Sequence, residues 1–250
     1  MDMEQRFAQL EEKIATLEHE LDRVNSVNEI QRLMSKYMIV HVRNSKWDGL
    51  TQATSWKLFA PREDTTLEAM GRGIYVGIDK IRKMYEELIG VGVEEGCMYE
   101  HDLTTAAIVV AKDGNTARGL WLSPGHETDP RFHPGSDKPV AMWAWGKVQA
   151  DFIRIDGVWY IWHYHFYSTF RCPFDESWVD YKGPEKLLRE QCVMGKERCD
   201  GCGYCHVNVD KNPSQKPPSY HRPYAPDQLT EPYPRCPEPY DTWTDDRLPV

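Results

Sequence analysis

Two long strands joined by a tight turn constrain the fold more than any other part of the sequence. Segments Val140–Ile155 and Val158–Phe170 are rich in aromatic and β-branched residues, and Asp156-Gly157 separates them. Asp-Gly favours the backbone conformations of a two-residue hairpin turn, so the segments are predicted to pair antiparallel, with Ile155 opposite Val158. The register of the sheet can then be followed outward from this turn.

That register predicts which side chains of the second strand share a face. In a regular hairpin, Ala150 lies opposite His163 and Val148 lies opposite His165. The face with His163, His165 and Tyr167 then also carries small apolar residues, which leaves room for a ligand. A one-residue bulge would reverse this assignment, because successive side chains of a strand point to opposite faces.

Shorter segments before this hairpin extend the predicted sheet. Glu100–Ala111 and Thr116–Leu122 are predicted to form a second hairpin around Asp113-Gly114-Asn115. His101 stands near the start of its first strand, at an expected sheet end. The segment Ser123–Pro139 has the composition of a loop, and loops of this length in compact domains are often lids or binding loops.

A helix predicted over Asn28–Asn44 carries two polar rings on its inward face. Ile30, Met34, Tyr37 and His41 recur at steps of four, three and four, so they share one side of the helix. A buried polar ring without a hydrogen-bond partner loses ~1–3 kcal/mol. A single inward histidine is more often a satisfied core residue than a catalytic one. The other histidines and tyrosines predicted to converge here favour a site.

Residues 1–25 are predicted to form a helical arm. A short heptad seam is marginal as an isolated coiled coil, so it is expected to pack on a second subunit or back on its own domain. We expect a homo-oligomer, either a dimer or a trimer. Val27 and Ile30 break the heptad phase, which predicts a bend before the next helix. The seam consists of Phe7, Leu10, Ile14, Leu17, Leu21 and Val24.

The charge and apolar content narrow the class of partner. A net charge of −9, without a basic stripe or tail, argues against nucleic acid and anionic membrane surfaces. No apolar run is long enough for a membrane helix, and the N-terminus is charged where a signal peptide would be apolar. These features predict a cytoplasmic protein with a small-molecule partner.

The C-terminal region is rich in proline and tyrosine and is predicted to form an extended wrap over the domain or over a neighbour. Cys199, Cys202 and Cys205 form a C-x2-C-x2-C pattern followed by His206. This spacing is compatible with zinc or an iron–sulfur cluster, with Cys192 or Cys236 as the fourth ligand. Unliganded thiols are the favoured alternative, because no fourth cysteine follows at the ferredoxin distance. We therefore include no metal in the predicted site.

The predicted helix, turn and strands together resemble the SnoaL-like branch of the nuclear transport factor 2-like superfamily. The similarity covers Asn28–Asp180 and rests on Ile30, Leu33 and Tyr37, on Trp47-Asp48, and on the final hairpin. It implies an α+β fold, a cone-shaped barrel of a curved antiparallel sheet packed on N-terminal helices. The expected organisation is an arm at 1–25, a barrel domain at 26–180 and an extended Pro/Cys-rich tail at 181–250.

The chain is most similar to the dehydratase and cyclase members, such as scytalone dehydratase and bile acid 7-alpha-dehydratase. The resemblance implies that Tyr37 polarises a substrate oxygen and that His101 is the base. Two positions depart from the pattern. His41 stands near the place where those enzymes have an aspartate that supports the histidine, and Ser168 stands near the place of an arginine that some relatives carry on the last strand.

These residues predict a cofactor-independent lyase, a dehydratase or related enzyme that removes water or formaldehyde from a bulky aromatic or polycyclic molecule. Histidine can take and give a proton near neutral pH, and a buried tyrosine can donate to a developing oxyanion. A non-catalytic binding protein and a scaffold are the alternatives. His163 and His165 could hold a metal only with an unidentified third ligand. The predicted catalytic residues are Tyr37, His41, His101, His163 and His165, and the predicted substrate-binding residues are Trp121, Trp143, Trp145, Tyr167 and His126.

Overall fold

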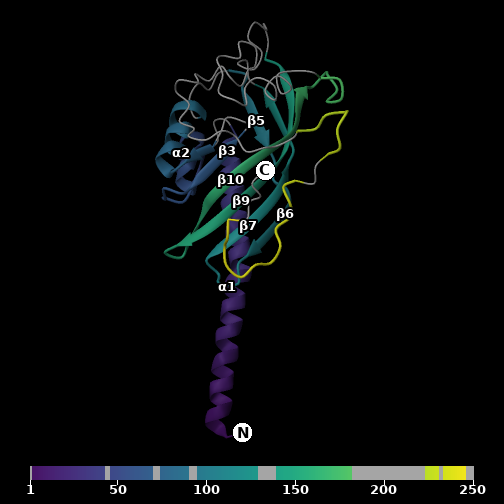
Figure 1. Cartoon of the computed structure of the whole chain (residues 1–250). Helices are drawn as coiled ribbons and strands as arrows, with labels where there is room; N and C mark the ends of the chain where they lie inside the picture. Colours follow the sequence, from purple (N-terminus) through teal and green to yellow (C-terminus); the bar gives the residue numbers. More distant parts are fainter. Residues whose placement is uncertain are drawn as a thin grey trace.

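The protein combines one long helix with a curved, mostly antiparallel sheet, which confirms the predicted α+β class (Figure 1). Three short helical segments complete the domain: η1 (Gln52–Leu58), α2 (Ile78–Met84) and the π-helical turn η2 (Tyr85–Ile89). This is a computed structural model, and it describes residues 2–42, 46–69, 74–89, 95–128, 139–181, 223–230 and 233–245.

Helix α1 runs without interruption from Met3 to His41, so the expected bend near Val27 does not break it. The heptad phase changes because the second half of the helix buries a different face. A capping box closes the N-terminus, where the Asp2 carboxylate accepts from the Gln5 backbone N–H and the Gln5 side chain accepts from the Asp2 backbone N–H. The first half projects beyond the sheet, and the second half lies against it (Figure 1).

The sheet is built around the hairpin of β9 (Ala141–Ile155) and β10 (Val158–Pro173). The strand order is β4-β3-β10-β9-β7-β6, and β8 joins the other end of β9 and pairs with β5. Strand β3 runs parallel to β10, whereas the other pairs are antiparallel. The remaining strands are β1 (Lys46–Trp47), β2 (Leu50–Thr51), β3 (Thr66–Ala69), β4 (Ile74–Val76), β5 (Met98–His101), β6 (Thr104–Val110), β7 (Thr116–Ser123) and β8 (Gly125–Thr128).

The predicted turn at Asp156-Gly157 is confirmed, with φ values of 50° and 81° and with Ile155 opposite Val158. The predicted register holds as far as Phe152 opposite Ile161 and is wrong beyond that pair. One bulge lies between Ile161 and His163, and another lies between Ser168 and Phe170. Each bulge adds one residue to β10 and reverses the faces of the side chains that follow.

Two further predictions about strands need correction. The segment Glu100–Ala111 is not one strand but two, since β5 pairs with β8 whereas β6 pairs with β7. The segment Ser123–Pro139, predicted to be a loop, contains β8. Its residues 129–138, the expected lid, lie outside the described residues.

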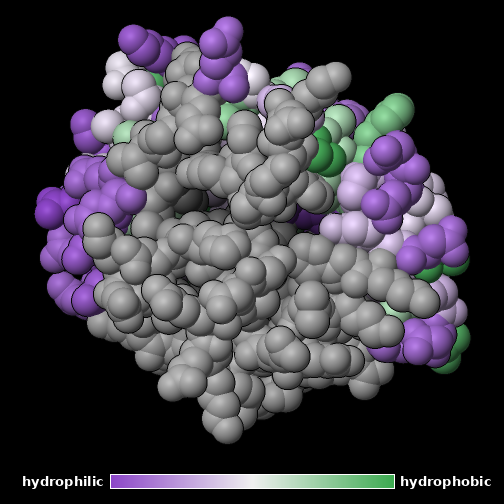
Figure 2. Space-filling view, turned by 90° about the horizontal axis from the view of Figure 1, so that it is seen from above, coloured by the Kyte–Doolittle hydropathy of each residue, from purple (hydrophilic) through white to green (hydrophobic). Residues whose placement is uncertain are grey.

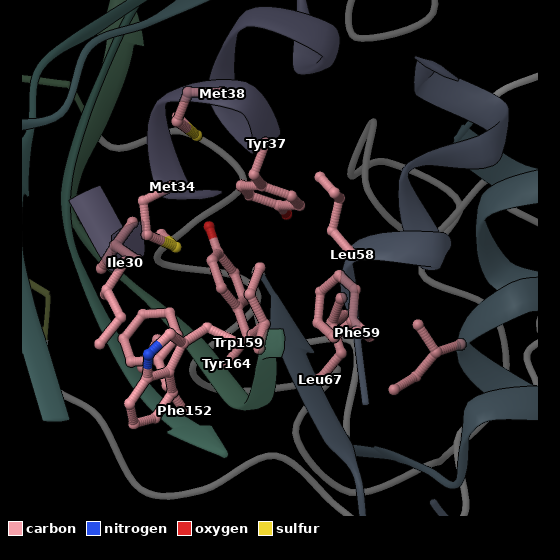
Figure 3. Close-up of a cluster of buried hydrophobic side chains, with 14 of the residues drawn as sticks. Ile30, Met34, Tyr37, Met38, Leu58, Phe59, Leu67, Phe152, Trp159 and Tyr164 are labelled. Atoms are coloured by element: carbon pink, nitrogen blue, oxygen red, sulfur yellow. The ribbon is translucent and has the colours of Figure 1, made fainter. Parts of the chain in front are cut away.

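The core fills the space between α1 and the concave face of the sheet (Figure 3). Helix α1 contributes Ile30, Met34 and Tyr37, which are 0–3% exposed, as the predicted helical face required. Phe152 and Tyr164 meet them from the final hairpin. On the side of the barrel where α2 lies, the outer surface is hydrophilic (Figure 2).

The described parts of the tail lie on the outer face of the sheet, opposite this core, and are extended except for a turn in which the Gln228 backbone N–H donates to the Ala225 carbonyl. Trp243 packs on Trp162 with ring centroids 4.5 Å apart, and the backbone carbonyl of Thr244 accepts from Arg118. The backbone N–H of Lys112 donates to the carbonyl of Tyr240. In the described part of the chain, no helix is long and apolar enough to cross a membrane.

Candidate active site

A buried carboxylate on β8 links two cationic or titratable side chains. One oxygen of Glu127 lies 2.9 Å from Nε2 of His101 on β5, and the other accepts from the Arg171 guanidinium on β10. The side chains of Glu127 and Arg171 are each only 4% exposed, and that of His101 is 8% exposed. The three groups therefore form a cluster that is largely shielded from water.

Burial raises the pKa of Glu127, but the Arg171 charge and the hydrogen bond from His101 more than offset it and hold the pKa at about 2. Glu127 is thus ionised at neutral pH and accepts from both neighbours. A carboxylate in this position holds the neutral imidazole with its proton on Nε2, because Nε2–H must donate to it. The Nδ1 atom of His101 is then the basic nitrogen.

The two bulges of β10 decide which of its residues reach this cluster. After the first bulge, Tyr164 lies opposite Ala150 and belongs to the core. After the second, Arg171 lies opposite Ala144, one of the buried small residues of β9, and reaches Glu127. Arg171, three positions after Ser168, is thus an arginine of the last strand that contacts the cluster, although Ser168 itself is not one.

A glycine leaves the space that the His101 ring occupies. A Cβ atom on Gly125 would lie 2.5 Å from Nδ1 of His101 and 2.9 Å from the backbone oxygen of Ala144. Neither contact is tolerable, and the Ala144 backbone cannot rotate away. Any larger residue at Gly125 would push His101 out of its position against Glu127.

If His101 is a catalytic group, Gly125→Ala should lower turnover by about 10²-fold, the effect of misplacing such a group by about an ångström. The measurement is kcat alongside the melting temperature. In a His101→Gln background the same change should have little further effect on turnover, since the misplaced group is already missing. Additive losses would show that Gly125 acts through something other than His101.

Three ring contacts join the cluster to α1 and to Phe166 of β10. The ring of His41, in the last turn of α1, lies 5.6 Å from that of His101, with the planes at 74°. Phe166 packs edge-on against His101 at 6.2 Å. Tyr37 stacks on His41 at 6.2 Å, one helical turn earlier. The structure therefore brings Tyr37, His41 and His101 together.

Tyr37 belongs to a group of three buried phenols. Its hydroxyl lies 2.8 Å from that of Tyr85 in η2, and its ring lies 5.1 Å from that of Tyr164. Burial, together with the neighbouring Tyr85, raises the pKa of Tyr37 well above its usual value. Tyr37 is therefore a neutral hydrogen-bond donor whose hydroxyl can in turn accept from Tyr85 (Figure 3 shows Tyr37 between α1 and Tyr164).

The structure does not bring His163 and His165 to this cluster. The first bulge of β10 turns them to the outer face, where Nδ1 of His163 lies 2.9 Å from the Thr66 hydroxyl. His165 stacks on Tyr167 at 3.6 Å and lies 3.4 Å from Glu68. The expectation that these rings share the concave face is wrong, because it assumed a regular register.

The predicted aromatic wall is also divided between the two faces. Trp121 is fully buried in the core, and its Nε1–H donates to Gln31. Trp143 and Trp145 lie on the outer face, paired along β10 with Cys172 and Phe170. His126 accompanies them and packs on Trp143 at 5.0 Å. None of these outer-face residues contacts the His101 cluster.

Glu127, Arg171, Tyr85 and Tyr164 are site residues that sequence reasoning missed. Glu127 lies in a segment with loop composition, and Arg171 follows two bulges that no short motif marks. Among the residues that the structure describes, no group of three or more His, Cys, Asp or Glu side chains is placed to hold a metal ion. Cys199, Cys202 and Cys205 lie outside those residues.

The long helix, the concave sheet and the polar cluster between them define an α+β cone with an internal group of buried ionisable side chains. A sequence model of the SnoaL-like domain matches residues 22–165. The chain therefore belongs to the SnoaL-like family of the nuclear transport factor 2-like superfamily, as its residues predicted. A comparison with curated protein sequences gives no match.

Several solved structures are similar to this chain. Hexachlorocyclohexane dehydrochlorinase LinA type 2 is 15% identical, with a TM-score of 0.50 over 66% of this chain and 99% of that chain. LinA type 3 from Novosphingobium barchaimii is 16% identical, with a TM-score of 0.48 over 63% and 96%. A scytalone dehydratase-like protein from Novosphingobium aromaticivorans is 16% identical, with a TM-score of 0.46 over 62% and 92%.

Proposed function

We propose that this protein is a cofactor-independent lyase that eliminates a small group, such as water, from a bulky aromatic or polycyclic molecule. The observation that carries the proposal is the His101–Glu127–Arg171 cluster, in which an ionised, buried carboxylate orients an imidazole as a base. The name of the structurally similar dehydrochlorinase denotes an elimination, which supports this class of reaction.

The proposed reaction begins with proton transfer from a substrate carbon to Nδ1 of His101. The electron pair of the broken C–H bond forms the new double bond, and the bond to the leaving group breaks. Glu127 stabilises the imidazolium that forms, because its negative charge lies 2.9 Å from the ring nitrogen. The reaction needs no nucleophile, because the protein acts only by removing the carbon-bound proton and by protonating the leaving group.

His41 is the proposed acid for the leaving group. Its ring lies beside that of His101, so one substrate held between α1 and β5 could contact both. If the leaving group is hydroxide, the proton from His41 converts it to water. His101 then releases its new proton to solvent, and His41 takes one up from solvent, which restores the starting protonation of both rings. Tyr37 polarises the substrate oxygen, and Tyr85 supports it through the hydrogen bond between the two hydroxyls.

We expect Tyr37→Phe to lower turnover by about 10²-fold, at the lower end of the range for removing an oxyanion donor. Tyr85→Phe is the matched control, because it removes the other hydroxyl of the same buried pair, to which we assign no contact with the substrate. Its effect on turnover should be smaller, and both variants should lose about 1 kcal/mol of stability. Equal losses of turnover would contradict the role assigned to Tyr37.

A panel of phenolic and steroidal compounds, incubated with the purified protein and analysed by mass spectrometry, tests the proposal. The expected result is one compound converted to a product lighter by water or formaldehyde. Compounds that raise the melting temperature of the protein but are themselves recovered with unchanged mass would instead indicate a binding protein of the same fold.

A further inference from the structure

The first half of α1 presents an apolar seam that nothing in the described part of the chain covers. Its residues repeat with heptad spacing, a and d positions alternating, and each is 53–68% exposed. The whole segment projects from the barrel (Figure 1). The seam consists of Phe7, Ile14 and Leu21 at a positions and Leu10, Leu17 and Val24 at d positions.

The barrel holds α1 by the opposite side of the helix. The His19 ring lies 2.6 Å from the backbone oxygen of Lys112, and Asp22 forms a bidentate pair with Arg154. Arg23 donates to the backbone oxygens of Val110 and Ala111. Counted in the same heptads, His19, Asp22 and Arg23 occupy f, b and c positions, which face away from a and d.

The sequence left open whether the seam packs on a second subunit or on its own domain, and this attachment decides between the two. The arm does not fold back on its own domain through the seam, because the domain contacts the other face. It also lowers the cost of forming a short coiled coil. The arm is already held helical by the capping box at Asp2 and by the Asp22–Arg154 pair in the middle of α1.

The charges beside the seam select a particular partner and orientation. Arg6 and Lys13 stand at g positions, and Glu11 and Glu18 stand at the following e positions. In a parallel, in-register pair, each g residue faces the e residue five positions later on the other helix. Arg6 then faces Glu11 of the second copy, and Lys13 faces Glu18. In an antiparallel pair, glutamates at e positions would face one another.

We propose that two copies of this chain associate through a parallel, in-register, two-stranded coiled coil of α1. Asn28, at the next a position, is exposed and continues the seam toward the barrel. A single polar residue at an a position favours one register. The barrels then lie on opposite sides of the paired arms, since each holds its helix by the face away from the seam. The association does not depend on the proposed reaction.

Light scattering and native mass spectrometry of full-length charge variants test the proposal. Arg6→Glu/Lys13→Glu makes the two g positions negative, like the e positions that they face. Glu11→Lys/Glu18→Lys makes the two e positions positive, like the g positions that they face. The wild type should have the mass of two chains, and each double variant alone should have the mass of one. An equimolar mixture of the two variants should recover a complex that contains one chain of each.

Gln9→Glu/Thr16→Glu is the matched control, because it adds charges at exposed c positions away from the seam. It should leave the mass at two chains. A wild type that is monomeric, or charge variants that keep the wild-type mass, would overturn the proposal. A mass of three chains would contradict the two-stranded arrangement, and failure of the mixture to pair would contradict the parallel orientation.

Discussion

Replacing His101 by Gln should lower turnover by ~10²–10⁴-fold and leave the melting temperature nearly unchanged. The expected loss is that of a general base. Glutamine suits this test because its side-chain N–H can still donate to Glu127, so the buried carboxylate keeps a partner. Turnover of the compound identified by the panel, together with thermal unfolding, is the measurement.

The outer-face histidines provide the matched controls for this variant. His163→Gln and His165→Gln change the same residue type on the same sheet, but these rings contact Thr66 and Glu68 rather than the Glu127 cluster. Both should keep the wild-type rate. If His101→Gln kept full turnover and His163→Gln lost it, His101 would not be the base, and the active site would lie on the outer face.

Arg171→Met should destabilise the fold by ~3–5 kcal/mol, the effect of leaving a buried ion without its partner. Glu127 would keep only the His101 hydrogen bond while remaining 4% exposed. The double variant Arg171→Met/Glu127→Gln should be less destabilised than Arg171→Met alone, because it removes the uncompensated charge. Urea unfolding at pH 7 measures both, and additive losses would mean that the two residues do not interact.

The same pair predicts how stability depends on pH. The pKa of Glu127 is about 2 in the folded protein against 4.5 for an unperturbed carboxyl, so the unfolded chain binds the proton first as the pH falls. The stabilisation from this group is therefore complete above pH 4.5 and is lost as the pH decreases toward about 2. Glu127→Gln should show a weaker loss of melting temperature over that interval than the wild type, and parallel curves would contradict the ionised pair.

Sequence reasoning succeeded where the signal was local. The 3.6-residue period placed Tyr37 and His41 on the buried face of α1, and Asp156-Gly157 fixed the turn of the final hairpin. These features depend on neighbours in the chain, so they can be read without the fold. The position of His101 was predicted less well, because it is the last residue of β5 (Met98–His101) and not the start of a longer strand.

The rest of the site depends on contacts between distant segments. A bulge changes the register by one residue, and nothing in the composition around Trp162 or Thr169 marks one. The predicted faces of β10 were therefore inverted, which placed His163 and His165 inside and overlooked Arg171. Glu127 was missed for another reason, because β8 is four residues long and forms only through its partners β5 and β9.

The most direct test of the proposed reaction is mass spectrometry of the converted compound in D2O, with wild type and His101→Gln in parallel. If His101 removes a carbon-bound proton in an elimination, the wild type should form the lighter unsaturated product, and a substrate labelled with deuterium at that carbon should lose its label and react more slowly. His101→Gln should form almost no product. A product that keeps the deuterium, or equal conversion by both proteins, would contradict proton abstraction by His101.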